Sequence, residues 1–339
     1  MKYHIPMPKV SVCVPVFNVE KFIEPCARSI FEQSLDDLEF IFVNDCSTDN
    51  AFSRLREVAA DYPHLQDRIH LIEHGSNQGP GAARNTAAQQ ATGDYIYFPD
   101  ADDYLAPNML EKMYCEAITS NSDIILCNID IINNGKTILS ENNDFLPTDN
   151  DWLRALLRHA PQALWWRLIK REIWQQASLN TDLRGIVRFE DLLMTIKCHY
   201  YASKVSRVKD VLYHKNANEG SVTHTHSRAA VDSAIKIGSM IENFLRSEGT
   251  YKRYATDIDR FRYIALIPFI ATTDYWNPTE WRMLLKQTVH AAHRIRYIGG
   301  LAFTLQIAVT HFLLVKQQDK MAFYVMKTMQ WIKKLCQIK

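Results

Sequence analysis

The stretch Gly93-Asp94-Tyr95-Ile96-Tyr97-Phe98-Pro99-Asp100-Ala101-Asp102-Asp103 combines a short apolar run with three carboxylates at its C-terminal end. If the run is a strand of an open α/β sheet, these carboxylates lie where such sheets bind their ligands. Carboxylates this close together repel one another and need a compensating cation, usually a hard divalent ion that also holds substrate phosphates. The alternative is an acidic turn without a ligand, because Asp-x-Asp alone occurs often by chance.

The chain before and after this stretch alternates short apolar runs with helical patterns. Strands are predicted at residues 10–16, 39–43, 69–72, 93–98 and 123–127, and helices at 19–33, 49–60, 81–91 and 107–119. This order predicts an α/β fold, with a mostly parallel sheet and flanking helices. Polar residues follow the first strands too, at 15–18, 44–49 and 75–85. Because parallel strands end at one edge of a sheet, we expect these groups to converge. Ser47 or Asp49 could instead serve as a helix N-cap.

Charge is distributed unevenly along the chain. Residues 281–339 carry ten Lys or Arg against one acid, a charge of +9, whereas the preceding part carries −8. Residues 297–315 contain no charged side chain, and Lys320, Lys327 and Lys334 would align on one side of a helix over 320–336. A basic amphipathic helix suits an anionic membrane interface. The alternative is a helix that packs on the rest of the protein.

The seven cysteines are scattered, odd in number and without C-x-x-C pairing, which argues against a disulfide framework or a zinc site. Residues 1–9 lack the apolar core of a signal peptide. We therefore expect reduced thiols in a cytoplasmic protein. Membrane association would be at the cytoplasmic face and peripheral; the alternative, a span formed by 297–315, is long enough but disfavoured by its glycines and polar residues.

Four ordered motifs resemble those of family 2 glycosyltransferases: Val-Ser-Val-x-Val-Pro-Val-Phe-Asn from Val10, Val43-Asn44-Asp45-x-Ser47-Thr48-Asp49, Asn77-x-Gly79-x-Gly81-x-Ala83-Arg84-Asn85, and Asp100-x-Asp102-Asp103. That family consists of inverting, nucleotide-sugar-dependent enzymes with the Rossmann-like GT-A fold. The resemblance implies a catalytic domain over 8–225, with a nucleotide-sugar-binding half at 8–127 and an acceptor half at 128–225. A helical C-terminal region, 226–339, would follow.

The resemblance also implies roles for individual residues. The nucleotide-sugar would be bound by residues from all four motifs: Pro15, Phe17, Asp45, Gly81, Arg84 and Asp100. Within this set, Asp45 would bind the base and Asp100 the ribose. Asp102 would bind Mn or Mg and Asp103 would support it, although which two carboxylates reach the ion stays open.

The segment Arg188-Phe189-Glu190-Asp191-Leu192-Leu193-Met194 places a Glu-Asp pair at the start of a helical run, where the helix N-terminus favours carboxylates. Taken alone, this is an ordinary helix start. In the resembled family the Asp of such a step is the general base, so Asp191 would take the proton of the attacking acceptor hydroxyl. Glu190 would position the acceptor or a neighbouring cation.

Two further residues have alternative interpretations. His214 lies in the strand predicted at 211–215, where a neutral imidazole could complete the shell of the ion or could be a structural or diphosphate-contacting group. Residues 163–172 resemble the family's segment bordering the acceptor, in which Trp165 or Trp166, with Trp166 preferred, would stack on a sugar, unless the pair fills the core. The Gln-x-x-Arg-Trp motif of processive synthases is missing from the sequence, which favours a single addition.

The predicted function is transfer of one hexosyl or N-acetylhexosaminyl group from a nucleotide-diphosphate donor, with a UDP-sugar favoured. The acceptor would be a hydroxyl of a glycan or lipid-linked molecule in cell-surface polysaccharide synthesis, and no nucleic-acid partner is expected. The alternative is a non-catalytic nucleotide-sugar-binding or scaffold protein that retains the fold. Clustered carboxylates favour the enzyme, because a scaffold has no need of them.

Overall fold

The computed structural model describes residues 8–133, 135–141, 147, 151–158, 160, 162–217 and 227–272. The chain divides into two compact units, Met1–Leu156 with Ala160–His224, and Leu157–His159 with Thr225–Lys339. Each unit is described by itself. The functional halves predicted at 8–127 and 128–225, and the role predicted for 226–339, stay predictions.

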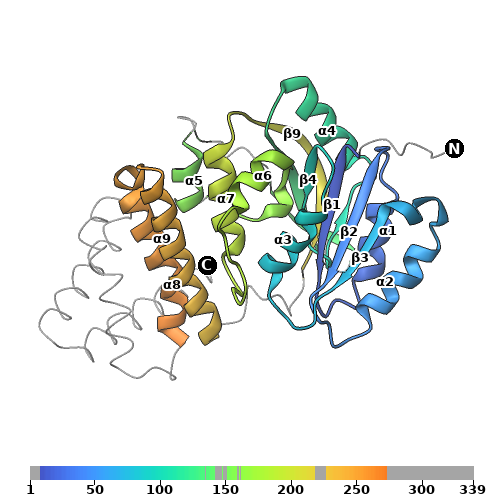
Figure 1. Cartoon of the computed structure of the whole chain (residues 1–339), viewed down its shortest axis with the longest axis horizontal. Coiled ribbons are helices and arrows are strands. Elements are labelled where there is room, and N and C mark those ends of the chain that lie inside the picture. The colour runs from blue at the N-terminus through green and yellow to red at the C-terminus, as the bar shows by residue number, and fades with distance from the viewer. Residues whose placement is uncertain are drawn as a thin grey trace, which may run out of the picture. The chain divides into compact units, whose positions relative to one another are not determined.

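The first unit is built on one mixed sheet with the strand order β3-β2-β1-β4-β8-β6-β9-β5, and β7 pairs with β6 (Figure 1). The strands β1 to β4 are parallel to one another, whereas β8 is antiparallel to both β4 and β6. The strands are β1 (Val10–Val16), β2 (Leu38–Asn44), β3 (Ile69–Glu73), β4 (Tyr95–Tyr97), β5 (Tyr104–Leu105), β6 (Ile124–Asn133), β7 (Lys136–Glu141), β8 (Arg167–Lys170) and β9 (Val205–Asn216).

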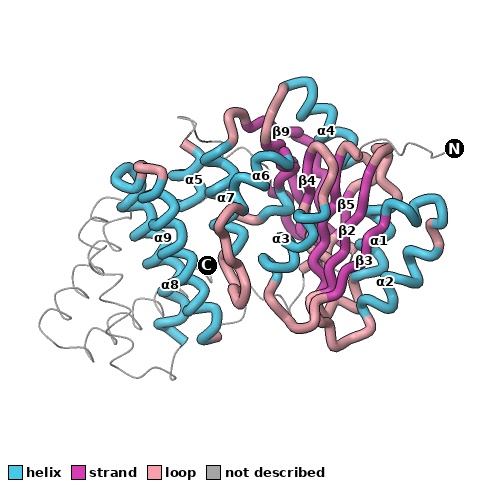
Figure 2. The backbone as a smooth tube through the Cα atoms, viewed as in Figure 1, coloured by secondary structure: helices cyan, strands magenta, loops and turns pink. Residues whose placement is uncertain are grey.

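The central strands are mostly apolar because helices cover both faces of the sheet (Figure 2), and the buried Ser11 and Glu39 in β1 and β2 hydrogen-bond to each other. The helices α1, α2 and α4 share one core with alternate residues of β1, such as Val12 and Val14. On the opposite face α3 packs on β1 and β2, and α6 packs on β4. The helices are α1 (Ile23–Phe31), α2 (Ala51–Ala60), α3 (Pro80–Gln90), α4 (Met109–Ser120), α5 (Trp152–Arg158), α6 (Arg171–Ser178) and α7 (Glu190–Tyr201), with 3-10 turns at Pro63–Arg68 and Leu164–Trp166.

The predicted α/β class is therefore confirmed, and the main differences lie at helix starts. The helix predicted from residue 19 begins at Ile23, because the backbone N–H of Glu20 donates to Asp49 Oδ2 at 2.9 Å and holds that stretch in a loop. Asp49 also accepts the N–H of Ala51 through Oδ1, at 3.1 Å. One of the two predicted capping candidates thus satisfies a first-turn donor of α2.

In the second unit, α8 (Arg228–Ser247) packs against α9 (Tyr251–Thr272). A Cβ at Gly238 would lie 2.9 Å from Arg262 Nε, so a glycine here allows the two helices to approach closely. Among the described helices, none is long and apolar enough to cross a membrane. The segments 297–315 and 320–336, on which the membrane predictions rest, lie outside the described residues.

Candidate active site

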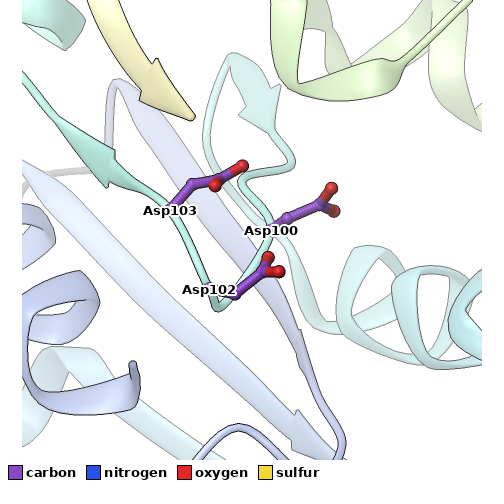
Figure 3. Close-up of side chains that lie close together, drawn as sticks. All are labelled: Asp100, Asp102 and Asp103. Atoms are coloured by element: carbon purple, nitrogen blue, oxygen red, sulfur yellow. The ribbon is translucent and has the colours of Figure 1, made fainter. Parts of the chain in front are cut away.

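The loop after β4 carries three carboxylates that gather in one place. Asp100, Asp102 and Asp103 project from this loop toward the same side (Figure 3), and one oxygen from each lies within 4.8 Å of the others. Carboxylate oxygens are the ligands that Mg²⁺ and Mn²⁺ prefer. The donor set therefore fits the divalent ion that the sequence predicts.

Asp103 anchors this loop to β9. Its side chain is buried, and it accepts the hydroxyl of Tyr213 at 2.6 Å and the backbone N–H of Asn216 at 2.8 Å. Burial, followed by the charges of Asp102 and Asp100, raises the pKa of Asp103 to about 8. The side chain thus holds the loop against β9, and its role in supporting a metal ligand stays a prediction.

Arg84, on α3, joins the β4 loop to the start of α7. Its Nη2 lies 2.7 Å from Asp100 Oδ1, while Nη1 lies 3.0 Å from Glu190 Oε1 and 2.8 Å from Asp191 Oδ1. Burial opposes the charge of this guanidinium, but the three carboxylates outweigh burial and raise the pKa of Arg84. Arg84 is therefore a permanent cation surrounded by site carboxylates.

Asp191 lies in the first turn of α7, after Phe189, whose φ of 68° turns the chain into the helix. Burial raises the pKa of Asp191, Arg84 lowers it, and Glu190 and Asp100 raise it again, with a result of about 7. The backbone of Leu164 also acts to lower the pKa of Asp191. A carboxylate with a pKa near neutrality is suited to accept a proton and return it to solvent.

Asp45, at the end of β2, fixes the loop that leads into α3. It accepts the backbone N–H groups of Gln78 and Gly79 at 2.9 and 2.8 Å, and it pairs with His74 Nδ1 at 2.7 Å. Gly79 has a φ of 95°, and a Cβ there would lie 2.8 Å from the carbonyl oxygen of Ile186. Both Asp45 oxygens serve this loop, and base recognition by Asp45 stays a prediction.

Three other predicted residues lie near this edge of the sheet. Gly81 lets α3 approach α7, because a Cβ there would lie 3.0 Å from Glu190 Cγ and 2.9 Å from Leu183 Cβ. Pro15 is half-buried in β1. Phe17, just beyond β1, is 44% exposed, so its ring is accessible to a ligand such as a nucleobase. Their contacts with a nucleotide stay predictions.

The structure does not support two of the predicted roles. Trp166 is 2% exposed and stacks on Trp165 with ring centroids 5.5 Å apart, so it fills the core and offers no face to a sugar. His214 is outside the carboxylate group found among the described residues and stacks on Tyr104. Because neighbouring strand residues point to opposite faces, the contact of Tyr213 with Asp103 directs His214 away from the cluster.

Tyr213 and Asn216, which hold Asp103, and His74, which pairs with Asp45, were not predicted from the sequence. Their partners lie 110, 113 and 29 residues away along the chain, so no local pattern connects them. The signal in the sequence is indirect: Tyr213 lies in the run 211–215, Asn216 directly follows it, and His74 follows the strand predicted at 69–72.

The family described as Glycosyl transferase family 2 matches residues 11–184, a stretch that contains Arg84 and the three carboxylates after β4. The chain belongs to glycosyl transferase family 2. It is 29% identical over 289 residues to a Bacillus subtilis (strain 168) protein named as glycosyltransferase EpsH, covering 83% of this chain and 81% of that one. It is 33% identical over 244 residues to EpsJ of the same strain, an uncharacterized glycosyltransferase, covering 68% and 67%.

A more remote relative of this glycosyltransferase is the poly(ribitol-phosphate) beta-glucosyltransferase of Bacillus spizizenii (strain ATCC 23059 / NRRL B-14472 / W23), 30% identical over 212 residues, with 61% of this chain and 32% of that protein covered. Among solved structures, residues 1–349 of S. aureus TarS in complex with UDP superpose with a TM-score of 0.71 at 18% identity, covering 95% and 91% of the two chains. The UDP-GlcNAc complex of TarS gives a TM-score of 0.69, at 19% identity and with 95% and 92% covered. This likeness confirms the predicted GT-A fold.

Proposed function

We propose that the protein transfers a single sugar, with inversion, from a nucleotide-diphosphate donor to a hydroxyl of a glycan or lipid-linked acceptor. Asp191 is the general base in this proposal. The observation that carries it is the bridge through Arg84, which bonds to both Asp100 and Asp191 and so sets a carboxylate with a pKa of about 7 beside the three-carboxylate loop. A donor held at that loop would present its anomeric carbon close to Asp191.

In the proposed reaction the acceptor oxygen forms a bond to the anomeric carbon from the face opposite the leaving group. The bond from that carbon to the diphosphate oxygen breaks, and its electron pair leaves with the nucleotide. The hydroxyl proton passes to Asp191, whose pKa of about 7 lets it be ionised beforehand and accept the proton during attack. Glu190, bonded to the same Arg84 nitrogen, would fix the position of this base.

A divalent cation, Mn or Mg, would be held by Asp102 together with Asp100 or Asp103, whose oxygens lie within 4.8 Å of one another. When bound, it supplies positive charge to the departing diphosphate. Arg84, which pairs with Asp100, adds a second, permanent cation. Asp103, held by Tyr213, keeps the loop in place for the ion.

The nature of the donor and acceptor is supported by the relatives. TarS has been solved with UDP and with UDP-GlcNAc, which favours a UDP-sugar here. The similarity to a poly(ribitol-phosphate) beta-glucosyltransferase supports a cell-surface polymer as the acceptor of this protein. Synthesis of such a polymer from nucleotide-sugars would place the protein in the cytoplasm, with the lipid-linked acceptor at the cytoplasmic face of the membrane.

A nucleotide-release assay tests the proposal. The full chain is incubated with UDP-, GDP- and dTDP-sugars, with and without Mn or Mg, and free nucleotide is measured. We expect release from one UDP-sugar, dependent on the ion. No release from any donor, combined with normal nucleotide binding, would favour the non-catalytic alternative.

A further inference from the structure

A pocket of about 430 Å³ lies between α3 and α6, within the first unit. The helix α3 contributes to this pocket and to the carboxylate site through different side chains. Arg84 contacts the site carboxylates, whereas Asn85 and Gln89 line the pocket. The other main contributors are Trp174, Gln175 and Ser178 of α6 and Thr181 of the turn that follows. Nothing in the proposed transfer reaction uses this pocket.

The lining is uncharged and mixes polar with apolar groups. Six of the nine lining residues carry an amide or hydroxyl group, the others are Ala88, Trp174 and Leu179, and none of the nine, all in the described part of the chain, carries a charge. Amides and hydroxyls both donate and accept hydrogen bonds. The Oδ1 atom of Asn85 is shielded from solvent, so hydrogen bonds to a ligand would come from the exposed side chains of the lining, such as Gln89 and Gln175.

These features discriminate between classes of ligand. A phosphate or carboxylate would need a cation that the lining lacks, and a metal ion would need charged oxygens. A purely apolar ligand would leave the amides without partners. A neutral saccharide fits, because its hydroxyls donate and accept while its C–H faces can pack on Ala88 and Leu179, which also line the pocket.

The turn after α6, which forms one wall of the pocket, is fixed by hydrogen bonds from α7. Lys197 of α7 is buried and donates its Nζ to the carbonyl of Leu179 at 3.3 Å and to the hydroxyl of Thr181. The N–H of Thr181 donates to the carbonyl of Ser178 at 3.1 Å. Asn180 has a φ of 54°, a left-handed conformation that asparagine tolerates. A ligand would therefore enter a preformed pocket without having to order the loop.

We propose that the pocket between α3 and α6 binds a neutral saccharide segment, one or two sugar units long, away from the reacting carbon. Its identity as part of the acceptor glycan rests on the proposed function, whereas saccharide binding does not. Binding of the acceptor glycan in this pocket would raise the local concentration of its reacting end at the carboxylate site.

The chain offers matched pairs for the test, because Gln89 and Gln175 line the pocket while their neighbours Gln90 and Gln176 do not. All four side chains are exposed, so their truncation should leave the fold intact. Saturation-transfer NMR with the full chain would measure binding of two probes, N,N′-diacetylchitobiose and maltotriose. Thermal melting would verify that each variant is folded.

We expect at least one probe to bind, and the double variant Gln89→Ala/Gln175→Ala to bind it about tenfold more weakly, through the loss of two ligand hydrogen bonds. The double variant Gln90→Ala/Gln176→Ala should bind like the wild type. Donor-nucleotide release should be equal in all three proteins. Failure of both probes to bind, or equal binding by the two double variants, would overturn the proposal even where release is normal. Saccharide binding without release from any donor would instead count against the proposed transfer alone.

Discussion

The Nη1 atom of Arg84 lies 2.8 Å from the Oδ1 atom of Asp191, and the other terminal nitrogen of the same guanidinium lies 2.7 Å from Asp100. The proposed base and the donor-binding loop are thus electrostatically connected through one buried cation. Arg84 lowers the pKa of Asp191 against the effects of burial, Glu190 and Asp100. A substitution of Arg84 should therefore change both the pH dependence of the proton transfer and the affinity for the donor.

The first prediction is that Arg84→Met moves the acid limb of the kcat–pH profile to higher pH. Asp191 must be ionised to act as base, so kcat rises with pH through its pKa, about 7 in the unchanged protein. Without the guanidinium the carboxylate loses the interaction that favours its charged form, and the limb shifts upward. Arg84→Lys, which keeps a positive charge, should shift it less. A limb that stays in place while the rate falls would show that Arg84 does not act through the base.

The second prediction concerns Asp191→Asn. If proton removal is the lost step, turnover should fall by about 10²–10⁴-fold while donor affinity, measured by calorimetry, changes little. Asp182→Asn is the control, because Asp182 is an exposed carboxylate that pairs with Arg184 just before α7. Normal turnover of Asp191→Asn, or loss of donor binding in that variant, would place the base elsewhere.

The third prediction separates the carboxylates after β4. Asp102→Asn should abolish transfer without unfolding the protein, because it removes a charged ligand of the ion that would neutralise the leaving diphosphate. Asp100→Asn should mainly weaken nucleotide binding. In thermal melts, Mn with UDP should raise the Tm of the unchanged protein, whereas Mn alone should not. Full activity of Asp102→Asn in the presence of a chelator would rule out the metal.

The fourth prediction tests the close approach of α3 to α7. In Gly81→Ala the new Cβ would lie 2.9 Å from Leu183 Cβ and 3.0 Å from Glu190 Cγ, so the segment before α7 must move. Overpacking of this kind costs about 1–3 kcal/mol of unfolding free energy, which urea denaturation would measure, and activity should fall with it. Gly75→Ala is the matched control, because a Cβ there meets no atom within 4 Å. Equal stabilities of the two variants would mean that the contact relaxes without cost.

The sheet could be predicted from the sequence because buried parallel strands such as β1 and β2 are mostly apolar runs, and their polar ends mark the edge that binds ligands. The connection between Arg84 and Asp191 was not readable in this way, since it spans 107 residues and depends on how closely α3 and α7 pack. The role of Trp166 also depends on tertiary packing, because a tryptophan can stack on a sugar or fill the core and its residue type does not distinguish the two. Only the tertiary packing shows that it is buried.

The last prediction is that residues 297–339 attach the protein to the cytoplasmic face of the membrane. These residues lie outside the described part of the chain, and the prediction rests on the +9 charge of residues 281–339 beside the uncharged run 297–315. Each Lys or Arg near an anionic leaflet adds roughly 1 kcal/mol of binding free energy, so a few engaged residues would offset the cost of confining one helix there.

Co-sedimentation with anionic and neutral vesicles would measure this attachment, for the full chain and for a chain that ends at Arg296. We expect the full chain to sediment with anionic vesicles at low salt and to be released as salt shortens the Debye length. The shorter chain lacks six of the ten basic residues of 281–339 and should stay largely in the supernatant. Equal recovery of both chains in the supernatant at low salt would mean that the tail does not bind the membrane. The case for a lipid-linked acceptor would then weaken, because the membrane surface is where such an acceptor would be met.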